Sequence, residues 1–269
     1  MSALREIRVR VTGAELVAYV QGDGLPVCFV HGFPFDHALW RHQLAAPGRW
    51  RRIALDLRGA GASTADAGGD WSMARYADDV VGVLDALDVR EAVVCGQSMG
   101  GYILFELLRR HAERVCAVIL CATRPDADSP DAKRARDELA AVAQRDGPDA
   151  VADRLLPRLL GAATRATRPD VVAEVRGMIG RCSVGGIVGA LRAMRDRPDS
   201  SATLRGLSVP ALVVAGEEDA IAPSGVAEAM VGLIPGAQLA LVPRAGHVVP
   251  LEQPDVTNRV LSDFLGSCA

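Results

Sequence analysis

The sequence has very little lysine and few aromatic residues. Lys133 is the only lysine among 30 basic residues in a chain of 269, and aromatic side chains make up 4%. The formal net charge is -3 and no long basic run occurs, which argues against a surface that binds the phosphates of a nucleic acid. We therefore expect no nucleic-acid partner.

Long apolar runs and metal-binding cysteine motifs are also missing. The N-terminus MSALREIRVRV has no apolar signal core, and no run approaches the ~20 residues of a membrane span. The six cysteines form no C-x-x-C pair and no Cys/His cluster with metal spacing. We expect buried free thiols, no metal or other cofactor, no membrane association and a cytoplasmic location.

Strand-like runs alternate with helical stretches over the first 121 residues. Helices are expected around Trp40, over residues 71–87 and over residues 102–110. Ser72 is a candidate N-cap of the second helix. This order predicts a mainly parallel sheet that is covered on both faces. The expected strands are residues 7–11, 16–20, 26–30, 52–57, 92–96 and Val115–Cys121.

Residues 122–205 have a different pattern. They are helical in period, show no clear strand, contain several prolines and are too many for a loop. Beyond them, strands are expected at residues 211–215 and Gln238–Val242, and a helix at residues 255–265. We predict an α/β core formed by residues 1–121 and 206–269, with a helical cap inserted at residues 122–205.

The strongest motif is Gly96-Gln97-Ser98-Met99-Gly100, which matches G-x-S-x-G between an apolar strand and a helix. A sharp turn at this point makes the serine hydroxyl project, and the two glycines leave room for the turn. The amide of Met99 then faces a developing oxyanion at a helix N-terminus. Ser98 is therefore the predicted nucleophile and Met99 one oxyanion donor.

A serine nucleophile needs a base, and the base needs an acid to orient it. Of the five histidines, His247 is best placed, because it follows the last strand and the chain order Ser, acid, His puts the base last. Asp219 lies between the two, just after the strand at residues 211–215. It is the predicted acid, with Glu217 and Glu218 as alternatives.

The segment His31-Gly32-Phe33-Pro34 follows the strand at residues 26–30. A loop in this position donates the second oxyanion hydrogen bond, and Phe33 is the candidate because Pro34 has no N–H. The side chain of Phe33 should then line the acyl pocket.

The remaining histidines and Asp56 have simpler interpretations. We expect His111 to cap the helix that follows the nucleophile, and His37 and His42 to lie on the surface of the first helix. Asp56 ends a strand ahead of the nucleophile. It is expected to anchor the turn at residues 58–61.

With these motifs, the chain resembles the α/β-hydrolase family over almost its whole length. Within that family it looks like the bacterial branch of 3-oxoadipate enol-lactonases, small carboxylesterases and cofactor-free haloperoxidases. The resemblance implies an eight-stranded sheet with a helical cap after the sixth strand, and the same triad and oxyanion residues. The motifs that carry it are HGFP, DLRGAGAS, GQSMGG, GEEDAIAP and AGHVVPLEQP, in this order.

The cap departs from the enol-lactonase pattern. Residues 122–205 contain no Trp, Tyr, Phe or His, whereas enol-lactonase caps usually bring aromatic or polar residues to the substrate. Arg124 and Arg192 are candidates for facing an acidic substrate. The cap's apolar residues either pack the cap or form a pocket roof, and they include Leu155, Leu159, Met178, Val184, Ile187, Leu191 and Met194.

The expected activity is hydrolysis of a small carboxylic ester or lactone through an acyl-enzyme. Within the enzyme class, a perhydrolase activity or a biosynthetic tailoring step, such as thioester cleavage or cyclisation, would use the same triad. A ligand-binding receptor with slow turnover is the alternative of another class. Fold alone does not choose among these, and the sequence is silent on oligomeric state.

Overall fold

The computed structural model describes residues 3–66 and 69–268, and its centre is an eight-stranded sheet in the order β1-β2-β4-β3-β5-β6-β7-β8. All eight predicted strands form, and none of their ends differs from the prediction by more than two residues. The strands are β1 (Arg5–Val11), β2 (Ala14–Gln21), β3 (Leu25–Val30), β4 (Trp50–Asp56), β5 (Ala92–Gln97), β6 (Val115–Cys121), β7 (Ala211–Gly216) and β8 (Gln238–Val242).

The sheet is antiparallel at one edge and parallel elsewhere. β1 and β2 form a hairpin, β2 runs antiparallel to β4, and the strands from β3 to β8 are parallel. Val30 pairs with Gly96, and Gln97 pairs with Cys121. The chain segments that leave β3, β5 and β6 therefore begin side by side, at the edge where parallel α/β sheets bind ligands.

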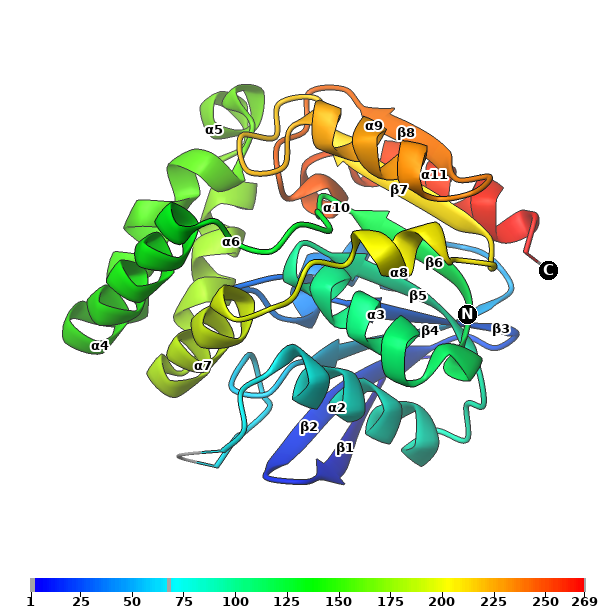
Figure 1. Ribbon diagram of the computed structural model, residues 1–269, viewed down its shortest axis with the longest axis horizontal. Coiled ribbons are helices and arrows are strands. Elements are labelled where there is room, and N and C mark those ends of the chain that lie inside the picture. The colour runs from blue at the N-terminus through cyan, green and yellow to red at the C-terminus, as the bar shows by residue number, and fades with distance from the viewer. Residues whose placement is uncertain (1–2, 67–68, 269) are drawn as a thin grey trace.

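Helices cover both faces of this sheet (Figure 1). One layer contains α2 (Met73–Ala86), α3 (Met99–Arg110), α8 (Ser201–Arg205) and α9 (Ser224–Leu233). The other contains η1 (His37–Trp40), α1 (Arg41–Leu44), α10 (Val249–Glu252) and α11 (Pro254–Gly266). A short turn, η2 (Ala112–Arg114), leads into β6. The predicted cap of α2 is confirmed, because Ser72 Oγ accepts from Arg75 N over 3.1 Å.

A helical insertion follows β6, as predicted, and no strand occurs in residues 122–205. Four of its helices form a layer beyond the carboxyl ends of the strands, at the left of Figure 1. The long helix α4 packs against α6 and α7, and α8 lies against α3 and α9 on the sheet. The four are α4 (Pro130–Leu159), which is interrupted at Gly147, α5 (Ala162–Thr167), α6 (Pro169–Gly180) and α7 (Val184–Arg195).

Glycines allow the insertion to sit directly on the core. A Cβ on Gly186 of α7 would lie 2.3 Å from the carbonyl oxygen of Gly59, and one on Gly189 would lie 2.0 Å from the ring of Trp71. Ser183 N donates to the same Gly59 oxygen over 2.9 Å. Because backbone meets backbone at this seat, no side chain larger than hydrogen fits there.

All six cysteines are free thiols, as the sequence predicted. Four of them are buried, and burial raises the pKa of Cys28 to about 12. Such thiols pack as small apolar groups. Within residues 3–66 and 69–268, no helix is both long enough and apolar enough to cross a bilayer.

Candidate active site

Ser98 stands at a sharp turn between β5 and α3. Its backbone has φ 50° and ψ -111°, in the left-handed half of the map that costs a non-glycine residue about 1–3 kcal/mol. A Cβ on Gly96 would lie 2.4 Å from the carbonyl oxygen of Gly100, and one on Gly100 would lie 2.2 Å from that of Val30. The glycines of the motif are thus required by close packing, as the sequence predicted.

Neighbouring strands hold this turn in place. Ser98 N donates to Cys121 O over 2.9 Å, and Thr123 Oγ1 donates to Ser98 O over 2.8 Å. The helix α3 begins at Met99, three residues earlier than predicted, and so includes Gly100 and Gly101 despite the low helix propensity of glycine. Met99 therefore lies in the first turn of a helix, where backbone N–H groups have no intrahelical acceptor.

His247 and Asp219 form a buried pair. His247 Nδ1 lies 2.8 Å from Asp219 Oδ2, and both side chains are almost fully buried. The other carboxylate oxygen of Asp219 accepts from Ile221 N and Ala222 N over 2.7 Å and 2.9 Å. A carboxylate can only accept here, so Nδ1 carries the proton and Nε2 is left as the basic nitrogen.

The alternative acids lie away from this pair. Glu217 is exposed, and Glu218 is half-buried with its Oε2 toward Ala163 N. His111 caps the end of α3, as predicted. His37 is partly exposed on η1, and its ring also stacks on Tyr19 while Nδ1 bonds to Asp56 Oδ1 over 2.8 Å, contacts that the sequence did not predict.

His31 fixes the loop that follows β3. Leu57 N donates to His31 Nε2 over 2.9 Å, so the ring proton is on Nδ1, which donates to Gly32 O over 2.8 Å. Burial lowers the pKa of His31, and the neutral ring is the form that can make both bonds. The backbone at Gly32 and Phe33 is thereby held beside the Ser98 turn.

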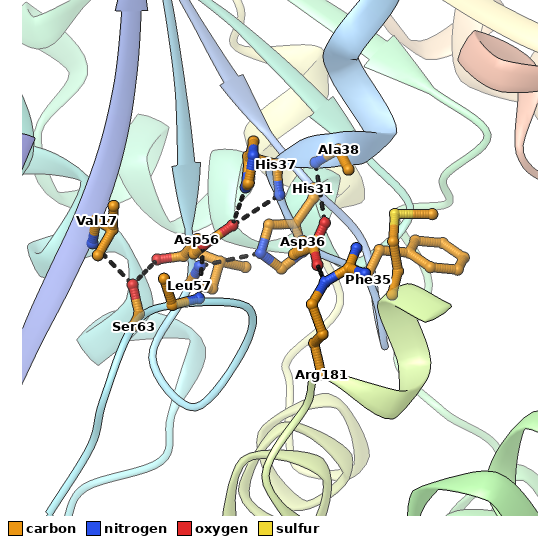
Figure 2. A network of polar contacts seen from close by, with 12 residues as sticks. Val17, His31, Phe35, Asp36, His37, Ala38, Asp56, Leu57, Ser63 and Arg181 are labelled. Atoms are coloured by element: carbon orange, nitrogen blue, oxygen red, sulfur yellow. Dashed lines mark hydrogen bonds and ion pairs between the residues drawn. The ribbon is translucent and has the colours of Figure 1, made fainter. Parts of the chain in front are cut away.

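A chain of polar contacts continues from this loop to the insertion (Figure 2). Asp56 Oδ2 accepts from Ala62 N, which confirms its predicted part as an anchor of the turn after β4. Burial alone would raise the pKa of Asp56, but the bonds and charge of His37 and the Ala62 amide bring it below its ordinary value. Next to it, Arg181 Nε donates to the buried Asp36 Oδ2 over 2.6 Å, so the end of α6 is bound to the loop after β3.

Asp36, His37 and Asp56 lie close enough together to share a cation. Their ligand atoms are already engaged within the chain. Asp36 accepts from Ala38 N and Arg181, and Asp56 accepts from His37 and Ala62. A cation here would have to displace the guanidinium of Arg181, so we assign the cluster to holding the loop.

Ser98 and His247 line one cavity between the sheet and the insertion, with a volume of about 570 Å³. Phe33 lines the same cavity. Of the two arginines considered for acidic substrates, Arg124 lies in the wall and Arg192 is exposed outside it. Tyr102 also lies in the wall, which sequence reasoning missed because an aromatic residue on an apolar helix face has the pattern of a core residue.

Most of the seven apolar residues named for the insertion either pack its helices or line a cavity, the two roles expected from the sequence. Met178 is fully buried in helix packing, Ile187 lines a smaller cavity beside the Gly32 loop, and Val184 is exposed. The remaining four form the wall of the large cavity, and they are Leu155, Leu159, Leu191 and Met194.

Comparison with known proteins agrees with this architecture. The family model for the alpha/beta hydrolase fold matches residues 26–254. The chain belongs to the α/β-hydrolase family. The expected family and fold class are therefore confirmed, including the eight-stranded, mostly parallel sheet and the helical insertion after β6.

Relatives with named activities place this α/β hydrolase among esterases and lactonases. A thermophilic esterase from Thermogutta terrifontis, solved with malate bound, is 37% identical with a TM-score of 0.94, over 98% of this chain and 99% of the other. The enol-lactonase from Burkholderia xenovorans LB400 is 29% identical with a TM-score of 0.89, over 97% and 100%. The 3-oxoadipate enol-lactonase 2 of Acinetobacter baylyi is 25% identical over 90% and 88%. These names agree with the expectation of a hydrolase that acts on ester bonds.

Proposed function

We propose that this α/β hydrolase cleaves small carboxylic esters or lactones through an acyl-enzyme on Ser98, with His247 as base and Asp219 as acid. The observation that carries the proposal is the buried His247–Asp219 hydrogen bond at 2.8 Å beside the strained Ser98 turn. The His247 side chain and Ser98 face one cavity, so the base and the nucleophile can meet at the same substrate.

Acylation follows from the tautomer that Asp219 imposes. His247 Nε2 takes the proton of Ser98 Oγ as that oxygen forms a bond to the substrate carbonyl carbon. The imidazolium that results is stabilised by the Asp219 carboxylate. It then gives its proton to the alkoxy oxygen, the ester C–O bond breaks, and the acyl group remains on Ser98. A water molecule, activated by the same base, hydrolyses the acyl-enzyme.

The negative charge on the tetrahedral carbonyl oxygen needs two donors. We assign them to the backbone amides of Phe33 and Met99, which belong to the loop after β3 and the first turn of α3. The rigid His31 contacts support this assignment, since a preorganised donor costs no reorganisation during the reaction. Loss of one such donor typically costs about 3–4 kcal/mol of transition-state stabilisation.

We further propose that residues 122–205 form a cap whose inner wall sets the acyl size. A cavity of about 570 Å³ is in the range of small-molecule sites, and its wall is mainly apolar near Leu155, Leu191 and Met194. This apolar part of the wall suits small uncharged esters and lactones. Arg124 offers a cationic position for a polar or acidic end of the substrate, and Arg136, Arg154 and Arg158 line the same cavity.

The proposal is tested with a series of p-nitrophenyl esters and a set of lactones, comparing the wild type with Ser98→Ala. We expect turnover in the wild type, with a maximum at short or medium acyl chains, and its loss in the variant. Turnover that survives in Ser98→Ala would refute the assigned nucleophile. A wild type that binds esters without turning them over would favour the slow receptor instead.

A further inference from the structure

Glu252 is a buried carboxylate that the proposed mechanism does not use. It ends α10, five residues after His247, and is 2% exposed. Its Oε1 accepts from Gly246 N over 2.9 Å and from Val248 N over 3.1 Å. A single oxygen thus binds the amides on both sides of His247.

The second oxygen of Glu252 binds the insertion. Oε2 accepts from Gly161 N over 2.8 Å, where Gly161 precedes α5. The two loops meet directly, because a Cβ on Gly246 would lie 2.3 Å from Gly161 N. His247 N also donates across this junction, to Leu159 O over 2.9 Å.

The donors at the junction suit a side chain with two acceptor oxygens. Gly246, Val248 and Gly161 all present N–H donors, and a carboxylate is an acceptor on both oxygens. Burial raises the pKa of Glu252, and these hydrogen bonds oppose that rise. Charge-assisted bonds of this kind are stronger than neutral ones, so the carboxylate can fix the angle of the His247 loop.

We infer that Glu252 is a positioning residue for His247. Its side chain fixes both the His247 loop and the contact of the cap with that loop at Gly161. The inference rests on the proposed function only in taking His247 as the base. Its consequence is that the cap and the base cannot shift independently, because Leu159, which lines the cavity, and Gly161 share this junction.

The test compares Glu252→Gln with Glu218→Gln. Both remove one negative charge near the same junction, but the Glu218 side chain accepts a hydrogen bond there only from the amide of Ala163, at 3.4 Å, and from none of residues 246–248. A glutamine at position 252 has one acceptor, so its NH₂ group faces either the loop donors or Gly161 N. Glu252→Asp serves as a second variant that keeps the charge with a shorter reach.

We expect kcat per folded enzyme to fall by about 10- to 100-fold in Glu252→Gln with a smaller change in KM, because displacement of a base by about 1 Å costs on that order. In a pH profile, the fall of kcat/KM on the acid side (the acid limb) should shift to a lower pH by at least about 0.5 unit, since a displaced imidazolium loses the Asp219 bond. Glu218→Gln should show neither change, and Glu252→Asp should be intermediate.

The low-field NMR resonance of the His247 Nδ1 proton provides a readout that needs no turnover. We expect it in the wild type and in Glu218→Gln, and shifted or lost in Glu252→Gln. A Glu252→Gln protein that is only less stable, with kcat, acid limb and resonance unchanged, would overturn the inference. If that variant does not fold, an unchanged Glu252→Asp would overturn it equally. A wild type that is inactive on esters refutes the proposed function alone, because the resonance still reports the position of His247.

Discussion

Gln97 Nε2 donates to the carbonyl oxygen of His247 over 2.9 Å, across 150 residues of sequence. The residue before the proposed nucleophile therefore supports the backbone of the proposed base. The amide oxygen of Gln97 is buried with no hydrogen-bond partner, and it fills the space in which Gly32 would carry a Cβ. One side chain next to Ser98 thus contacts both the loop of Gly32 and the loop of His247.

Gln97→Met should loosen the His247 loop. The substitution keeps the length of the side chain and removes the donor, so the buried His247 oxygen loses its partner at a cost of about 1–3 kcal/mol. Removal of the unpartnered Gln97 oxygen offsets part of this cost. We expect kcat for a short ester to fall at least about 5-fold, measured beside the free energy of unfolding in urea. Unchanged kcat would show that the bond is dispensable.

Asp219→Asn should almost abolish turnover while the fold remains. The Ile221 and Ala222 amides require the acceptor oxygen of the new side chain, so its NH₂ group is turned toward His247 Nδ1. That arrangement stabilises the wrong tautomer, which in a comparable triad lowers kcat by about 10⁴-fold. Glu217→Gln is the matched control and should stay near wild type. A small loss of kcat in Asp219→Asn together with a large loss in Glu217→Gln would identify Glu217 as the acid instead.

Gly32→Ala should lower activity, because the added methyl group displaces the loop after β3. Its Cβ would lie 2.1 Å from Gln97 Oε1 and 3.0 Å from Ser98 Cβ, so the loop after β3 must move away from the nucleophile. We expect a loss of at least about 10-fold in kcat/KM. Gly232→Ala, on α9 with nothing within 4 Å, should instead raise the unfolding free energy by about 0.4–1 kcal/mol. Equal behaviour of the two variants would contradict the packing described for Gly32.

The lowered pKa of His31 makes stability depend on pH. The unfolded chain binds a proton on this ring below its ordinary pKa of about 6.5, whereas the folded chain keeps it neutral. The stability from His31 is therefore complete above about pH 6.5 and is lost as the pH falls through the lowered folded value. Between these values the slope from this group is up to about 1.4 kcal/mol per pH unit.

Urea unfolding at several values between about pH 5 and 7.5 checks this dependence. His31→Gln can keep an acceptor for Leu57 N and a donor for Gly32 O, so the variant should show a flatter slope. Identical slopes in wild type and variant would mean that another group carries the acid sensitivity.

The sequence predicted the sheet well because its strands are short apolar runs with clear ends, as in Val115–Cys121. The residues of the candidate site followed from motifs, and their roles stay predictions until they are tested. The bond of His37 to Asp56 was not predicted because it depends on how η1 packs over β4. Glu252 was missed for a similar reason. Its bond to Gly161 spans 91 residues, and no local pattern encodes such a pair.

The glycine seat between Gly59 and Gly186 restricts how the substrate range of this enzyme can evolve. A side chain at either position would lift the whole insertion from the core, so adaptation there is blocked. The cavity wall formed by α4 is different, because Ala132, Ala135 and Leu139 line the cavity on a helix that packs mainly on α6 and α7. Directed evolution toward larger or smaller acyl groups should therefore accept changes in α4 long before it accepts any at the seat.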